Sequence, residues 1–425
     1  MENQSKKNYA LPIAMMFALF FMVAFVTGLQ NPFAVIVKSQ FHASNFLSQL
    51  GNFANFIAYA CMGIPAGIML EKIGYKKTSL AAVLVGFVGV GITFLSGTLG
   101  SFSVYLLGAL ISGFSMCMLN VVVNPMLNTL GGGGNKGNQL IQFGGSFNSI
   151  GATIAPVLIG YLMGSNESMR TIARANPALF ITMGVFVLAF IVLATMDIPE
   201  PSVTINNKEK GTIDPYSHFS FRHYIFGVIA IFIYVGIEVG IPNIANLFMT
   251  NQIHIDPTIA GSVVGTYWFL MLIGRFIGGL AGGKVSSKVM LGTVSFFLFI
   301  LVICAIYVPV KYMVNMPVFQ SDISFGIAKV PLCIVFLIIG GLCTSIMWGS
   351  IYNLAVEGLG KYTAKASGFF MVMVCGGGIL PAFQGYLADV FSYMTSYWLI
   401  AACLGYLFFF AVFGSKNVNK DIVTA

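Results

Sequence analysis

The sequence predicts an all-α membrane protein whose twelve transmembrane helices form two pseudo-symmetric six-helix bundles. Three observations lead to this prediction: the composition, the spacing of the apolar stretches and a repeat between the two halves. Apolar residues make up 57% of the 425 residues and charged residues only 8%, against roughly 25% charged residues in an ordinary soluble domain. So few charges could not cover the surface of a soluble fold of this size. Most of the chain is therefore expected to lie in lipid.

Twelve apolar stretches are each long enough to cross a bilayer as a helix. Such a crossing takes about 20 residues, because in lipid the segment must satisfy its own backbone hydrogen bonds. The stretches lie near residues 9–37, 47–70, 78–97, 102–129, 138–163, 177–196, 222–249, 258–281, 289–310, 330–355, 364–389 and 396–414.

One longer polar interruption divides the twelve stretches six and six. It is rich in proline, asparagine and charged side chains, a composition typical of a linker. The predicted units are an N-terminal six-helix bundle at residues 1–196, a cytoplasmic linker at 197–221 and a C-terminal six-helix bundle at 222–425.

The two halves also carry a repeat. Asn31-Pro32 interrupts the first stretch, and Pro242-Asn243 interrupts the seventh about 210 residues later. Two similar bundles suggest a transporter that works by alternating access, with its substrate bound between them near the midplane.

The basic residues predict the orientation. With the N-terminus inside, cytoplasmic segments hold sixteen of the 21 lysines and arginines, and the outer segments hold five. Since basic residues favour the cytoplasmic side, both termini are expected there, in a multi-pass protein of the cell (inner) membrane. The net charge of +8 is spread over short runs and forms no single basic patch, so nucleic acid is not an expected partner.

The segment from Gly67 to Lys77 reads GIMLEKIGYKK. It resembles the signature loop of the major facilitator superfamily, G-x-x-x-D-[RK]-x-G-x-[RK]-[RK], with Glu71 where aspartate is usual. Other segments resemble the fucose-permease-like branch of sugar–cation symporters, which includes permeases for glucose, galactose or fucose. These segments are Gln30-Asn31-Pro32, Asn124-Pro125, Ser146 to Ala152 and the run from Ser350 to Asp389. The resemblance covers nearly the whole chain and implies the major facilitator fold.

We expect the signature loop to act as a cytoplasmic gate. Its charges would hold helices together at the inner face, and its glycines would permit close approach and a tight turn. Arg275 is expected to do the equivalent in the second half, where the echo of the loop is weaker. The predicted gate residues are Gly67, Glu71, Lys72, Gly74, Lys76, Lys77 and Arg275.

Two carboxylates of proton-coupled fucose-permease-like proteins are absent here. Gly28 stands where an aspartate would precede the Asn-Pro of the first helix, and Asn120 where a glutamate would precede that of the fourth. The proton mechanism of the family therefore cannot be transferred to this chain from the sequence.

Glu238 is the one carboxylate well inside a predicted span. A charge at a helix centre costs at least about 2.5–3.5 kcal/mol, so its presence indicates a function. We expect Glu238 to couple transport to an ion, assisted by Asn243. Proton and sodium both remain open; the absence of a second titratable group to relay a proton slightly favours sodium.

Polar side chains follow single faces of several predicted helices, as their spacing of three or four residues shows. Amides both donate and accept hydrogen bonds, as sugar hydroxyls do, and aromatic rings can stack on the apolar face of a pyranose. Hydrogen bonding between helices is the alternative for any one amide. The faces comprise Asn120, Asn124 and Asn128; Gln139, Gln142, Ser146 and Ser149; Asn45, Gln49 and Asn52; and Ser345, Trp348 and Tyr352. The predicted sugar-binding residues are Asn31, Asn120, Asn124, Gln142, Tyr267, Trp348 and Tyr352.

The predicted function is import of a monosaccharide, a hexose such as glucose, galactose or fucose, by symport with sodium or a proton. A sugar uniporter or an efflux transporter of the same superfamily is the alternative. A membrane-embedded receptor or enzyme is disfavoured, because no metal-ligand spacing, catalytic nucleophile or extramembrane module is present. We expect no cofactor besides the co-transported sodium ion or proton. The protein is expected to lie in the lipid bilayer and to be a monomer.

Overall fold

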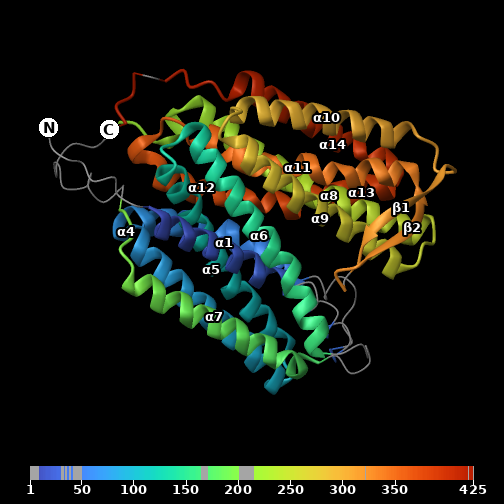
Figure 1. Cartoon of the computed structure of the whole chain (residues 1–425), viewed down its shortest axis with the longest axis horizontal. Helices are drawn as coiled ribbons and strands as arrows, with labels where there is room; N and C mark the ends of the chain where they lie inside the picture. The colour runs from blue at the N-terminus through green and yellow to red at the C-terminus, as the bar shows by residue number, and fades with distance from the viewer. Residues whose placement is uncertain are drawn as a thin grey trace.

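The computed structural model describes residues 9–29, 33, 36–37, 40–41, 50–163, 171–200, 215–320, 322–419 and 421–424. Helices of the first half gather on one side of the molecule and those of the second half on the other (Figure 1). The first group comprises α1 (Ala10–Gly28), α4 (Leu50–Leu99), α5 (Phe102–Leu130), α6 (Gly134–Met163) and α7 (Asn176–Thr195). The second comprises α8 (Arg222–Leu247), α9 (Pro257–Gly282), α10 (Ser287–Tyr307), α11 (Leu332–Val356), α12 (Thr363–Val372), α13 (Gly376–Val390) and α14 (Tyr393–Phe409).

These helices match the twelve apolar stretches. Within the described residues, ten helical segments are long and apolar enough to cross a membrane. One of them is α4, which covers both the second and the third stretch, and the fifth stretch is α6. The predicted all-helical membrane fold is therefore confirmed, whereas the residue boundaries of the two bundles and the linker stay predictions.

The long helix α4 is bent at Gly74, whose φ of 81° lies in the left-handed region that favours glycine. The carboxylate of Glu200 accepts hydrogen bonds from the backbone N–H groups of Tyr75 (2.6 Å) and Lys76 (2.8 Å). Because free N–H groups at a helix start attract an anion, Glu200 caps the second part of α4. A β-carbon at position 74 would lie 2.5 Å from this carboxylate.

A β-hairpin lies between α10 and α11, where the sequence predicts only a loop. Strand β1 (Met313–Phe319) pairs antiparallel with β2 (Phe325–Pro331). Phe319 stacks on Phe269 of α9 with ring centroids 4.6 Å apart, which attaches the hairpin to the helix group. Its strands are short and adjoin apolar spans. The alternation of buried and exposed residues that marks a strand is therefore hard to distinguish from the neighbouring apolar spans in the sequence.

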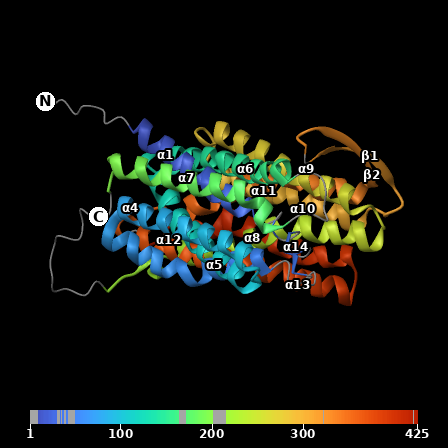
Figure 2. The same ribbon diagram turned by 90° about the horizontal axis from the view of Figure 1, so that it is seen from below.

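The molecule has two dissimilar ends. We call the end that holds the bend of α4 the Gly74 end, and the opposite end the hairpin end; Figures 1 and 2 show β1 and β2 at the far end of the long axis from the chain termini. At the Gly74 end α4 and α12 pack backbone to backbone. A β-carbon at Gly67 would lie 2.9 Å from the Cα of Gly368. The close approach expected of Gly67 is therefore present.

Candidate functional site

An ion pair lies inside the second helix group. Glu238 of α8 and Arg275 of α9 approach to 3.3 Å between Oε1 and Nη2, and both side chains are largely buried, at 13% and 12% exposed. Neither charge could be buried alone without a large desolvation cost. From the sequence, Glu238 is expected to be isolated and Arg275 to belong to the cytoplasmic gate. The expected isolation of Glu238 is wrong, because Arg275 of the neighbouring helix pairs with it, whereas the gate role of Arg275 stays a prediction.

The guanidinium of Arg275 also reaches the other helix group. Its Nη1 donates to three oxygens of α6: the carbonyl of Gly145 (3.2 Å), Oδ1 of Asn148 (3.2 Å) and Oγ of Ser149 (2.7 Å). Arg275 therefore joins the buried carboxylate of one bundle to the backbone and polar face of the other.

A second contact between the bundles forms beside this pair. The indole N–H of Trp348 on α11 donates to Oδ1 of Asn124 on α5 at 3.1 Å. The Trp348 ring packs edge-on against Tyr234, one helical turn before Glu238, with centroids 6.3 Å apart. Two of the predicted sugar-binding residues thus meet each other near the ion pair.

The predicted amide faces of α5 and α6 bond other helices: Asn128 and Gln142 bond the second bundle, whereas Asn120 bonds within the first. Asn120 donates to the hydroxyl of Tyr59 at 2.7 Å, Gln142 donates to the carbonyl of Ile346 at 2.7 Å, and Asn128 donates to Asn353 at 2.6 Å. These bonds supply the interhelical role that the sequence analysis leaves open. A role in binding sugar stays a prediction.

Several predicted residues are placed elsewhere. Tyr267 and Tyr352 are fully buried, and their hydroxyls bond Thr344 and Ser367 within the second bundle. Asn243 is exposed, and among the described residues no hydrogen bond joins it to Glu238. Asn31 lies outside the described residues, as do Asn45 and Gln49.

The expected gate residues meet charges that the sequence analysis does not single out. Glu71 pairs with Lys365 of α12 at 3.1 Å across the bundles. The ammonium of Lys76 donates to the carbonyl of Met196 at 2.6 Å. Lys72 and Lys77 are exposed. The acidic residue Glu200 could have been noticed in the sequence, since it directly follows the last apolar stretch of the first half.

Gln384 of α13 is another residue that the sequence analysis misses. Its side chain is fully buried, and neither its Nε2 nor its Oε1 has a partner among the described residues. It points at Gly240 of α8, where an added β-carbon would lie 2.6 Å from Oε1. An amide left unpaired in this way costs roughly 1–3 kcal/mol, so it is a candidate to bind a polar ligand.

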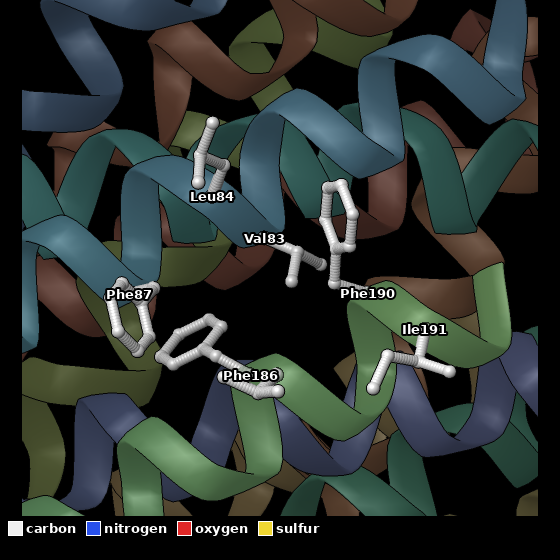
Figure 3. Close-up of a pocket in the computed structure, with 7 residues that line it drawn as sticks. Val83, Leu84, Phe87, Phe186, Phe190 and Ile191 are labelled. Carbon is white, nitrogen blue, oxygen red and sulfur yellow. The ribbon is translucent and has the colours of Figure 1, made fainter. Parts of the chain in front are cut away.

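The crevice in Figure 3 lies away from these polar groups. It has a volume of about 180 Å³ and is lined by side chains of α4 and α7, all of them hydrocarbon or aromatic. Such a lining offers no hydrogen bond to a sugar hydroxyl. We interpret the crevice as part of the lipid-facing surface. The lining residues are Val83, Leu84, Phe87, Phe186, Val187, Phe190 and Ile191.

Comparison with known proteins decides the family. The Major Facilitator Superfamily matches residues 16–319. The chain belongs to this superfamily. The predicted resemblance is thereby confirmed, as is the expectation of a membrane transporter rather than an enzyme.

The relatives extend over almost the whole chain. A glucose/galactose transporter of Brucella abortus is 29% identical and aligns with 98% of this chain and 97% of its own length. A putative glucose/galactose transporter of Helicobacter pylori is 27% identical, with 98% and 100% covered. The L-fucose-proton symporter of Escherichia coli is 23% identical, with 97% and 95% covered. The crystal structure of FucP, a Major Facilitator Superfamily transporter, in the outward conformation superposes on this chain with a TM-score of 0.81. The two chains are 20% identical, and the superposition covers 96% of this chain and 100% of FucP. This likeness confirms the fold.

Proposed function

We propose that this transporter imports a hexose together with a proton by alternating access of its two bundles. The observation that carries the proposal is the buried pair of Glu238 and Arg275 at the contact between the bundles, beside the amide and indole groups of Asn124 and Trp348. The names of the full-length relatives support a hexose as substrate, and the name of the Escherichia coli relative supports the proton.

The ion pair favours a proton over sodium. A sodium site needs oxygen ligands with net negative charge around them, and the guanidinium of Arg275 already neutralises Glu238. The slight preference for sodium from the sequence rested on the absence of a second titratable group to relay a proton. A proton can bind to one oxygen of Glu238 while Arg275 stays in place, so no ligand cage is required.

We propose a location in the inner membrane, as a monomer, with both termini in the cytoplasm. The Gly74 end then faces the cytoplasm. Among the described residues, the hydrogen bonds between the bundles lie in the half toward this end, on α5, α6, α9, α10 and α11. The conformation is accordingly closed inside and faces outward.

The polar groups at this contact support a sugar site between the bundles. We place the hexose against Trp348 and the amides of Asn124 and Gln142, at the contact between the bundles. Its hydroxyls can replace the bond between Asn124 and Trp348, since the amide oxygen accepts and the indole N–H donates. The unpaired amide of Gln384 supplies further partners from the second bundle.

Transport into proteoliposomes tests the proposal. Labelled glucose, galactose and fucose are offered under an imposed proton gradient and, separately, under a sodium gradient. Accumulation with the proton gradient alone is expected. Glu238→Gln should abolish accumulation yet retain exchange of labelled for unlabelled sugar, which needs no net ion movement.

The outcomes distinguish the alternatives. Uptake that follows the sugar gradient equally with and without ion gradients would identify a uniporter. Accumulation driven by sodium would contradict the proton assignment. If Glu238→Gln still concentrates sugar with wild-type dependence on the proton gradient, Glu238 is a structural residue.

A further inference from the structure

We infer that the hairpin of β1 and β2 is a membrane-surface anchor. Its exposed face binds the phospholipids of the leaflet at the hairpin end, which is the outer leaflet in the proposed orientation. This interaction surface goes beyond the proposed function, because it depends neither on the sugar nor on the coupled ion.

Both faces of the hairpin carry apolar side chains. Side chains alternate between the two faces along each strand, and one face is buried against the protein. The opposite face leaves Ile327 78% exposed and Phe325 66% exposed. An antiparallel hairpin with one face in water usually has polar side chains there, so this face indicates a partner other than water. The buried face comprises Met316, Val318, Ala328 and Val330.

The hairpin is seated on the lipid-facing side of α9. The rings of Phe319 and Phe325 both contact Phe269, with centroids 4.6 Å and 5.5 Å away. The side chains that follow Phe269 along the same face of α9 are apolar and exposed, as expected of a stripe that faces acyl chains. The hairpin covers one end of this stripe, and its exposed face continues it. The stripe beyond Phe269 comprises Ile273, Phe276 and Leu280.

The backbone of the hairpin limits how deep it lies. A two-stranded sheet has N–H and C=O groups along both free edges, and such groups cannot stay unpaired in hydrocarbon. The N–H of Phe319 donates to the hydroxyl of Thr266 at 2.8 Å. Edge groups without a protein partner require water or lipid headgroups. The hairpin therefore lies at the level of the headgroups, with its exposed apolar side chains directed into the leaflet.

Aromatic and basic side chains mark the same level. Tyr307 at the end of α10 is 70% exposed, and its ring meets Trp398 of α14 edge-on at 6.2 Å. Tyrosine and tryptophan are enriched where a membrane meets water. Lys311 and Lys329 are exposed at the base of the hairpin, whereas among its described residues the one carboxylate is Asp322 in the turn. This excess of positive charge favours anionic phospholipids.

Quenching of an added tryptophan locates the exposed face. The full chain is placed in nanodiscs that contain phosphatidylglycerol, with Ile327→Trp introduced into a Trp268→Phe/Trp398→Phe background. The signal of the background protein, which retains Trp348, is subtracted. A nitroxide near the glycerol end of the lipid should quench the added indole about 2-fold more than one at the acyl terminus, since interfacial segments bury their apolar face about 5–10 Å into the headgroup boundary. Acrylamide in the water should quench it weakly.

Val423→Trp is the matched control. Val423 is 71% exposed, close to the value for Ile327. Its segment is held on the loop before α12, because the carbonyl of Thr424 accepts a hydrogen bond from the N–H of Lys361 at 3.0 Å. We expect this end of the second bundle to face water. Acrylamide should therefore quench the control indole, and neither lipid label should.

The outcomes test the anchor directly. Should Ile327→Trp fail to fold, Pro317→Trp replaces it, since the two residues lie opposite each other on the exposed face. Strong quenching by acrylamide with none by either lipid label would place this face in water and overturn the inference. An indole that no quencher reaches would be covered by protein, for example a second copy of the chain, and would overturn it too. Stronger quenching by the acyl-terminal label would contradict the depth at the headgroups.

Discussion

The two bundles contribute different chemistry to the surface where they meet. The first bundle offers uncharged amides, among them Asn120, Asn124 and Gln142, and the second offers a buried ion pair. Among the described residues up to position 200 the carboxylates are Glu71 in the first bundle and Asp197 and Glu200 just after it. The comparison teaches that two halves of a pseudo-symmetric fold can differ in chemistry, with hydrogen-bonding amides in one bundle and a buried ion pair in the other.

Packing explains why the first bundle has no carboxylate at the position related to Glu238. That position is Gly28, and a β-carbon there would lie 3.1 Å from both the carbonyl oxygen of Ala152 and the Cβ of Ala155. The neighbours on α6 therefore crowd a β-carbon at this position and disfavour a larger side chain. Close helix packing occupies the place that a charge holds in the second bundle.

The largest expected effect breaks the ion pair of the second bundle. Arg275→Leu leaves Glu238 buried without a counter-ion, and removal of one partner of such a pair typically costs about 3–5 kcal/mol. Thermal unfolding in detergent should show this loss. The double variant Glu238→Leu/Arg275→Leu should recover most of the stability while remaining unable to accumulate sugar. An Arg275→Leu single variant as stable as the wild type would mean that the Glu238 carboxylate is hydrated and does not need Arg275 as its counter-ion.

The next effect sharpens the role of the first bundle. Asn124→Ala removes the acceptor of the Trp348 indole and should weaken hexose binding by about 1–3 kcal/mol. Binding measured with a series of deoxy-hexoses should show the loss for some hydroxyl positions and not for others. Equal losses for every analogue would assign Asn124 to helix packing alone. The proton dependence of transport should stay unchanged, since within the described residues Asn124 makes no hydrogen bond to the ion pair of Glu238 and Arg275.

A smaller effect concerns the carboxylate that the first bundle keeps at its end. Gly74→Ala forces an L-residue into the left-handed region and meets Glu200, which should cost about 1–2 kcal/mol in unfolding free energy. Gly184→Ala is the control, because a β-carbon there meets nothing within 4 Å and should raise stability slightly. Equal unfolding temperatures for the two variants would contradict the cap.

The smallest effect lies where the charges of the two bundles meet, next to Lys365. Burial, and then the charge of Lys365, lower the pKa of His218 from 6.5 to about 4. The unfolded chain therefore binds a proton more readily than the folded one, and this contribution to stability is lost as pH falls from about 6.5 toward 4. The unfolding temperature of the wild type minus that of His218→Phe should fall over this window. A constant difference would show that His218 is solvated.

The sequence predicts the fold well because each span is a local property. Every apolar stretch corresponds to a helix, and the interruption at Gly74 appears in the printed motif. The β-hairpin is missed because its strands are short and lie beside spans that share their apolar composition.

The candidate site is predicted only in part. Glu238 stands out because a lone carboxylate in an apolar run is visible from the sequence alone. Its partner Arg275 lies 37 positions later, and their pairing depends on how α8 and α9 pack. The buried, unpaired amide of Gln384 gives no signal either, since burial and partnering are decided by helices far apart in the chain.

The cap formed by Glu200 also has a mechanical consequence. Its carboxylate holds the backbone at Gly74 through two short hydrogen bonds, and Lys76 holds the carbonyl of Met196 close by. The end of α7 is thereby fastened to the middle of α4. When the second bundle moves relative to the first, the force reaches α7 through the chain after residue 200. These hydrogen bonds pass that force to α4, so we expect α7 not to unwind. We therefore expect α4 and α7 to move together as one rigid unit.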